Sequence, residues 1–230
     1  MTSAPSTWQK LTSPGISAVR NNLRPFLIIQ VCLVAAAVAY YRVPSVQAFA
    51  ENLAQTKVRS GLMGAAIANI IASIVIPQAA RALSRAPLLA RRDVPFQILF
   101  FGFLGMVIDL LYQVLDRVFG KEPNLVTLIQ KVCTDMFISS PLVTIPFSAA
   151  MFAFHERGYS LARTRTAFRN GGFLAIYMPM LVTCWAFWLP AVSAIYAMPN
   201  PALQFLLYLF AEAGWSLIIV HMARSEAATP

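Results

Sequence analysis

Residues 94–115 read VPFQILFFGFLGMVIDLLYQVL, and this stretch decides the fold class. Asp109 is the one charged residue in it. About 20 predominantly apolar residues cross a bilayer as an α-helix. Barrel strands alternate polar and apolar residues, whereas residues 98–101 are Ile-Leu-Phe-Phe. A helix also satisfies every backbone N–H and C=O within the segment, as lipid requires. The stretch therefore predicts a transmembrane α-helix.

Five more apolar stretches lie outside this one, at 25–41, 61–77, 125–154, 173–198 and 201–223. The whole chain is 58% hydrophobic and 12% charged, against about 25% charged in soluble domains. We expect an all-α fold, a polytopic transmembrane helix bundle with five or six membrane helices. Prolines at 141 and 146 predict a kink in the fourth stretch, and those at 179 and 190 predict one in the fifth. Residues 198–201, Met-Pro-Asn-Pro, predict a tight helical hairpin.

The net charge of +9 does not indicate nucleic-acid binding, because the basic residues lie in short segments between apolar stretches. If all six stretches cross, one side of the membrane holds both termini and the segments 78–93 and 155–172. That side has most of the Lys and Arg residues, so the positive-inside rule places both termini in the cytoplasm or its equivalent. The segment 155–172 is either an ordinary basic loop or an amphipathic helix against anionic head groups.

The N-terminal region, 1–50, differs from the rest because it contains no Asp or Glu. It combines Ser, Thr and basic residues with the pattern Ala48-Phe49-Ala50. Two interpretations stay open: a removed targeting segment, with the mature protein starting near Glu51, or a retained extra membrane helix. The helix bundle is expected over 51–224, followed by a short tail at 225–230.

Neither a metal site nor a catalytic motif is evident in the sequence, so we expect no enzyme, no cofactor and no bound metal. The cysteines, Cys32, Cys133 and Cys184, have no metal-ligand spacing. Small residues recur every four positions at Gly61, Ala65, Asn69 and Ser73. That face serves either oligomerisation or packing within the bundle.

Ionisable residues inside apolar helices are the strongest functional signal, since they are costly in lipid. Spacings of three and four place them on polar helix faces, and Lys131 with Asp135 forms an i,i+4 pair. These faces either line a water-filled path or hold the bundle together by pairing with one another, with Arg117 or with Lys131. The candidate pore-lining or intramembrane polar residues are Asp109, Gln113, Asp116, Asp135, Gln204, Tyr208 and Glu212.

Five blocks of sequence, in order, resemble the Mpv-seventeen family of mitochondrial inner-membrane and peroxisomal membrane proteins. Residues 112–117, YQVLDR, resemble the family's W-Y-x-x-L-D-R, and 131–141 resemble K-x-x-x-D-Q-x-x-x-x-P. Residues 185–190, WAFWLP, resemble N-W-x-x-W-P, and 60–64 resemble a glycine motif. Pro199 and Trp215 fall close to the family's later V-P and W positions. Met136 and Cys184 replace the Gln and Asn of these patterns. The matching structural residues are Gly61, Gly64, Tyr112, Leu115, Arg117, Lys131, Pro141, Trp185, Trp188, Pro190, Pro199 and Trp215.

The resemblance implies a weakly selective small-solute channel, or an organelle membrane homeostasis protein, in a mitochondrial inner or peroxisomal membrane; a plastid membrane is also open. The alternative is a non-transporting structural subunit of a larger membrane complex. The expected partners are the lipid bilayer, small solutes, and either a second copy or a membrane-complex partner, with no nucleic acid.

Overall fold

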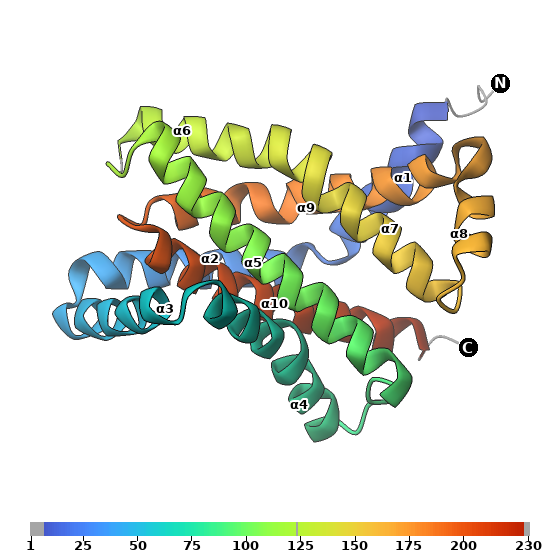
Figure 1. Cartoon of the computed structure of the whole chain (residues 1–230), viewed down its shortest axis with the longest axis horizontal. Helices are drawn as coiled ribbons and strands as arrows, with labels where there is room; N and C mark the ends of the chain where they lie inside the picture. The colour runs from blue at the N-terminus through green and yellow to red at the C-terminus, as the bar shows by residue number, and fades with distance from the viewer. Residues whose placement is uncertain (1–6, 123, 228–230) are drawn as a thin grey trace. The chain divides into compact units, whose positions relative to one another are not determined.

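The computed structural model describes residues 7–122 and 124–227, apart from the side chains of 7, 170 and 217–227. The described residues contain no strand and form an all-α fold, as predicted (Figure 1). The elements are α1 Thr7–Asn21, α2 Leu23–Arg42, α3 Pro44–Ile70, η1 Ile71–Val75, α4 Ile76–Leu83, η2 Arg91–Asp93, α5 Val94–Phe119, α6 Leu125–Thr134, η3 Asp135–Thr144, α7 Ile145–Glu156, α8 Leu161–Phe168, η4 Arg169–Gly171, α9 Gly172–Tyr196 and α10 Pro201–Ala227.

Each of the six apolar stretches lies in helical structure, and the ends agree within four residues except for the stretch 61–77, whose helical segment begins at Pro44 and ends at Leu83. Among the described residues, five helical segments are long and apolar enough to cross a bilayer: Leu23–Arg42, Pro44–Leu83, Arg91–Phe119, Leu125–Glu156 and Gly172–Tyr196. The sixth stretch is covered by α10, whose side chains beyond Ser216 are outside the described part. The chain is therefore a multi-pass integral membrane protein.

The segment between the first two apolar stretches is more ordered than a connecting loop. Helix α3 begins at Pro44, where proline suits the first helical turn, and continues through residues 45–60. Gly61 interrupts it with φ 58° and ψ −151°, a conformation that favours glycine. The Ala48-Phe49-Ala50 pattern lies inside α3. Removal of a targeting segment at this pattern stays a prediction.

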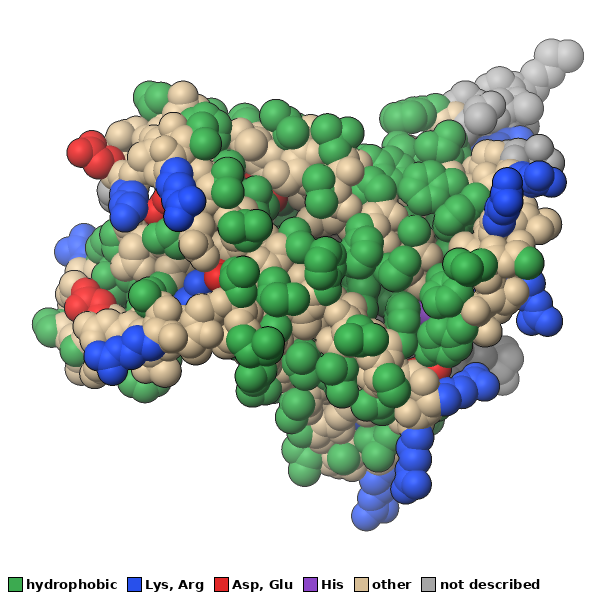
Figure 2. All heavy atoms as spheres, viewed as in Figure 1, with side chains coloured by type: hydrophobic (Ala, Val, Ile, Leu, Met, Phe, Trp, Pro, Cys, Tyr) green, Lys and Arg blue, Asp and Glu red, His purple; other side chains and the backbone are tan. Residues whose placement is uncertain are grey.

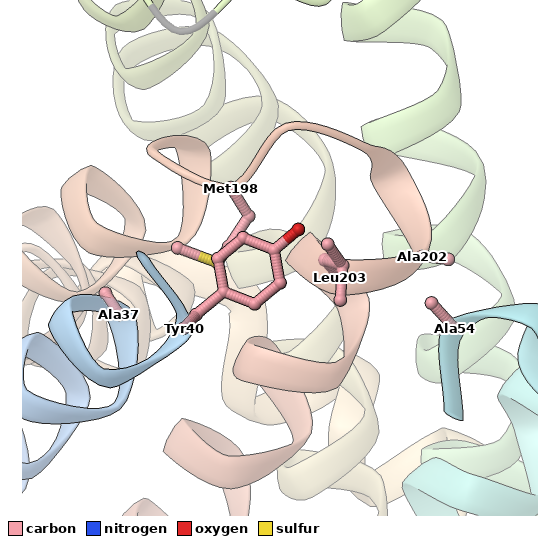
Figure 3. Packing of buried hydrophobic residues seen from close by; sticks show 6 residues of the cluster. All are labelled: Ala37, Tyr40, Ala54, Met198, Ala202 and Leu203. Atoms are coloured by element: carbon pink, nitrogen blue, oxygen red, sulfur yellow. The ribbon is translucent and has the colours of Figure 1, made fainter. Parts of the chain in front are cut away.

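Two compact units divide the described chain, one formed by residues 7–23 and 133–190, the other by 24–132 and 191–227. In the second unit α3, α5 and α10 pack side by side (Figure 1). Helix α2, which belongs to the N-terminal region 1–50, packs in this unit too. Figure 3 shows one of its contacts, a cluster in which Tyr40 of α2 lies against Met198 and Leu203.

The small-residue face of α3 packs against α5 within the chain. A Cβ placed on Gly105 would lie 2.5 Å from the Asn69 Cβ and 2.9 Å from the Ala65 carbonyl oxygen. Small residues let two membrane helices approach this closely. The sequence leaves two roles open for this face, oligomerisation and packing within the bundle. In the structure the face packs against α5 of the same chain.

In the first unit, the predicted kink at Pro141 takes the form of the wide turns of η3. Proline removes a backbone donor, and wide π-type turns leave carbonyls without their regular partners. Side chains of α9 use two of them: the Trp185 indole donates to the Met136 carbonyl at 2.7 Å, and the Tyr177 hydroxyl to the Pro141 carbonyl at 3.0 Å. Helix α9 continues through Pro179 and Pro190.

The outer surface of the helices is apolar, as lipid contact requires. Leu99 of α5 is 74% exposed and Leu142 of η3 is 71% exposed. Figure 2 shows hydrophobic side chains over the visible face of α5, with Lys and Arg side chains near the connection from α4 to α5. Exposed apolar area of this extent marks a membrane surface.

Candidate functional site

A line of polar side chains, most of them buried, follows the contact between α3, α5 and α10, all within the second unit. We call it the polar seam, and it also includes one lysine of α6. Its members are Lys57, Asn69, Ser73, Asp109, Gln113, Asp116, Lys131, Gln204, Glu212 and Ser216.

The first group of the seam is built around Asp109 in the middle of α5, which is 0% exposed. Lys57 of α3 forms an ion pair with its Oδ1 atom, and Gln113, one turn later on α5, donates to Oδ2 at 3.0 Å. The Lys57 ammonium also lies 5.1 Å from the centre of the Phe205 ring of α10, which adds a cation–π contact. Asp109 thus has a cation and an amide donor in place of water.

The second group joins α5, α6 and α10 around Asp116. Lys131 forms an ion pair with its Oδ1 atom, and both side chains are 2% exposed. Gln204 donates to the same oxygen at 3.3 Å and to the Met198 carbonyl at 3.1 Å. The second Asp116 oxygen and the Gln204 carbonyl oxygen are buried without a hydrogen-bond partner among the described residues.

The third group lies between α10 and η1 and contains no lysine or arginine of the described side chains. The Ser73 hydroxyl donates to the Glu212 Oε1 atom at 3.0 Å, and the Ser216 hydroxyl also hydrogen-bonds to this carboxyl group. Asn69 lies one turn before Ser73. Its amide nitrogen donates to the Phe101 carbonyl at 2.7 Å, while its oxygen is buried without a described partner.

Tyrosine rings fill the space between these groups. Tyr112 of α5 is 1% exposed, with ring centres 5.4 Å from Tyr196 and 6.2 Å from Tyr208 of α10. On α10 the seam extends from Gln204 to Ser216, about 18 Å at 1.5 Å per residue. The hydrocarbon core of a bilayer is about 30 Å thick, so the seam covers more than half of that depth.

The structure brings six of the seven predicted polar residues to this one contact. The predicted polar faces are present: Asp109, Gln113 and Asp116 share one side of α5, and Gln204, Tyr208 and Glu212 share one side of α10. Asp135 is buried in η3, in the first unit. Its predicted pairing with Lys131 stays a prediction.

One of the basic residues that pairs with the buried acids differs from the sequence prediction. Arg117 was a candidate partner for the acids, but it is exposed, and Asp109 pairs with Lys57 instead. Lys57 was missed because it lies outside the apolar stretches. A signal was present: Lys57 precedes Gly61 by four residues, so it extends the recurrence of Gly61, Ala65, Asn69 and Ser73 by one turn.

The residues that carry the resemblance described above lie in both units. Tyr112 and Leu115 are buried in α5, and Trp215 of α10 lies 5.5 Å from Phe26 of α2, centre to centre. Pro141 lies in η3 and Trp188 in α9. Gly64 lies in α3 one turn after Ser60, Pro190 lies near the end of α9, and Pro199 lies in the turn before α10.

No group of three or more His, Cys, Asp or Glu side chains among the described residues could hold a metal ion. Comparison of the chain with protein-family models, curated proteins and solved structures found no match. The fold and the polar seam define the class of the protein: it is a multi-pass α-helical membrane protein with charged side chains in its interior.

Proposed function

We propose that the protein is a weakly selective small-solute channel whose path follows the polar seam and is closed in this conformation. The observation that carries the proposal is the seam itself. A helix bundle in lipid needs no charged interior, and intramembrane ionisable residues generally mark pathways for ions or solutes. Here five ionisable residues lie along the contact between α3, α5 and α10, one of which, Lys131, comes from α6.

The seam has features that suit a closed path. Three buried oxygen atoms, on Asn69, Asp116 and Gln204, accept no hydrogen bond from the described residues. Buried polar atoms are normally satisfied by protein or by water, so these oxygens favour water entry when the helices separate.

Helix irregularities lie beside the seam and supply points where it opens. Gly61 breaks α3 one turn after Lys57, and η1 places wide turns at Ser73. Wide turns within helices recur at functional sites, and a break lets one half of a helix move without the other. Opening at these two points would separate Lys57 from Asp109 and Ser73 from Glu212.

A second candidate, a non-transporting structural subunit of a larger complex, is favoured by the two closed ion pairs. Lys57 with Asp109 and Lys131 with Asp116 are complete, buried and electrically neutral. Such pairs specify one arrangement of helices even where they add little net stability. The apolar outer surface would then meet protein as well as lipid.

We further propose membership of the Mpv-seventeen family and an organelle membrane as the location. Support comes from the order of the five sequence blocks and from the burial of Tyr112, Leu115 and Lys131 among them. A channel of this kind contains no catalytic step.

Release of entrapped solutes from liposomes that contain only the purified protein tests the proposal. Liposomes are loaded with small charged and uncharged solutes and with a large dextran. We expect release of the small solutes alone. Gln113→Leu, which removes a polar side chain from the seam, should slow release, whereas the neighbouring lipid-facing control Val114→Leu should not. Folded protein that releases nothing would favour the structural-subunit candidate.

A further inference from the structure

The charges of the polar seam balance except at one residue. Lys57 neutralises Asp109 and Lys131 neutralises Asp116. Glu212 is 5% exposed and has no ion pair with a described Lys or Arg side chain. The seam therefore has one carboxylate more than it has cations.

The elements packed against α10 supply no further cation to this carboxyl group. Helix α3 contributes Lys57, which pairs with Asp109, and Arg59, which is exposed, and the Arg24 and Arg42 side chains of α2 are exposed too. Helix α5 contributes Asp109, Tyr112 and Asp116, whose surroundings are described above, and η1 has no titratable residue. Helix α4 contributes Arg81, which donates to the Pro87 carbonyl at 3.3 Å. On α10 itself Tyr208 lies one turn before Glu212, and the side chains of His221 and Arg224 are outside the described part.

An ionised carboxylate at this depth is costly unless a cation accompanies it. Two hydroxyl groups already approach Glu212, from Ser73 at 3.0 Å and from Ser216. Each hydroxyl has one O–H donor and two lone pairs, so it can donate to the carboxylate, accept from a protonated carboxyl, or turn its lone pairs toward a bound ion. Hard cations take oxygen ligands of these types.

We propose that Glu212, Ser73 and Ser216 form a binding site for a monovalent cation, either a proton or a sodium ion. The site restores the neutrality of the buried seam in the folded protein. Cation binding at this site does not require that the seam conducts solutes. The site proposal therefore goes beyond the channel proposal, and each can be refuted without the other.

Thermal unfolding of the purified full chain in detergent tests the site without any transport assay, because a cation that binds the folded state raises its stability by mass action. The melting temperature is measured from pH 5 to pH 9 in choline, and at fixed pH in sodium against choline. A proton site predicts a melting temperature that falls as the pH rises in choline. A sodium site predicts a higher melting temperature in sodium than in choline at alkaline pH.

In either case Glu212→Gln, which keeps the shape of a protonated carboxyl, should lose the dependence. Ser73→Ala should shift the pH or the sodium concentration at which the melting temperature changes. The exposed acid control Glu156→Gln and the control His221→Gln should both keep the wild-type dependence. A wild-type melting temperature that responds to neither cation would overturn the proposal, as would the same response in Glu212→Gln. If Glu212→Gln does not fold, an unchanged response in Ser73→Ala overturns it instead.

Discussion

Replacing Lys57 by Met leaves Asp109 buried and charged without its cation. The Lys57 side chain is 10% exposed and that of Asp109 is 0% exposed, so water cannot replace the lost partner without rearrangement of the helices. Breaking a buried pair by removing one member costs about 3–5 kcal/mol. Loss of the contact with the Phe205 ring adds about 1 kcal/mol. We therefore expect Lys57→Met to lower the free energy of unfolding by about 4–6 kcal/mol.

The assay is reversible unfolding in mixed micelles with increasing SDS. Removing both charges, in Lys57→Met with Asp109→Leu, should restore most of the loss, since no buried charge is then left alone. Arg59→Met is the matched control, because Arg59 is exposed two residues from Lys57, and it should change stability by less than about 0.5 kcal/mol. A cost below about 1 kcal/mol for Lys57→Met, or a double variant that loses the sum of both single effects, would refute the reasoning.

Three further predictions concern packing, a polar contact and topology. Gly105→Ala should destabilise the protein by about 1–3 kcal/mol in the same unfolding assay, because its Cβ would overlap α3; a neutral effect would contradict the close approach. Trp185→Phe should cost about 1 kcal/mol by leaving the Met136 carbonyl without its donor, and an unchanged stability would argue against that bond. Cysteines at Arg163 and Ser225 should be labelled from the same side of the membrane. Labelling from opposite sides would exclude six crossings.

The helices could be predicted from the sequence because each apolar stretch has to satisfy its own backbone in lipid. The stretch starting at Val94 begins where α5 begins, and the predicted turn at 198–201 lies between the end of α9 at Tyr196 and the start of α10 at Pro201. Polar faces were also predictable, since residues three and four positions apart lie on one side of a helix. This spacing alone predicts Asp109 with Gln113 on one side of α5, and Gln204 with Glu212 on one side of α10.

Partner choice could not be predicted in the same way, because it depends on how helices pack in space. Asp109 lies 52 positions from Lys57, and local spacing indicates nothing about that pair. Helicity at 45–60 was missed because this segment is polar, and hydropathy detects only the lipid-facing part of a long helix. The wide turns of η1 contain no proline, but Pro77 follows two residues later and cannot donate to the Ser73 carbonyl, a signal that the hydropathy pattern does not show.

The most direct test of a solute path along the polar seam is the reversal potential of purified protein in a planar bilayer under a KCl gradient. The seam has one unbalanced acid, and acidic side chains along a path favour cations. We expect cation-selective currents from the wild type and from the exposed control Glu156→Gln, with selectivity much reduced in Glu212→Gln. No current from the folded wild type, or the same reversal potential in all three proteins, would contradict a path along the seam.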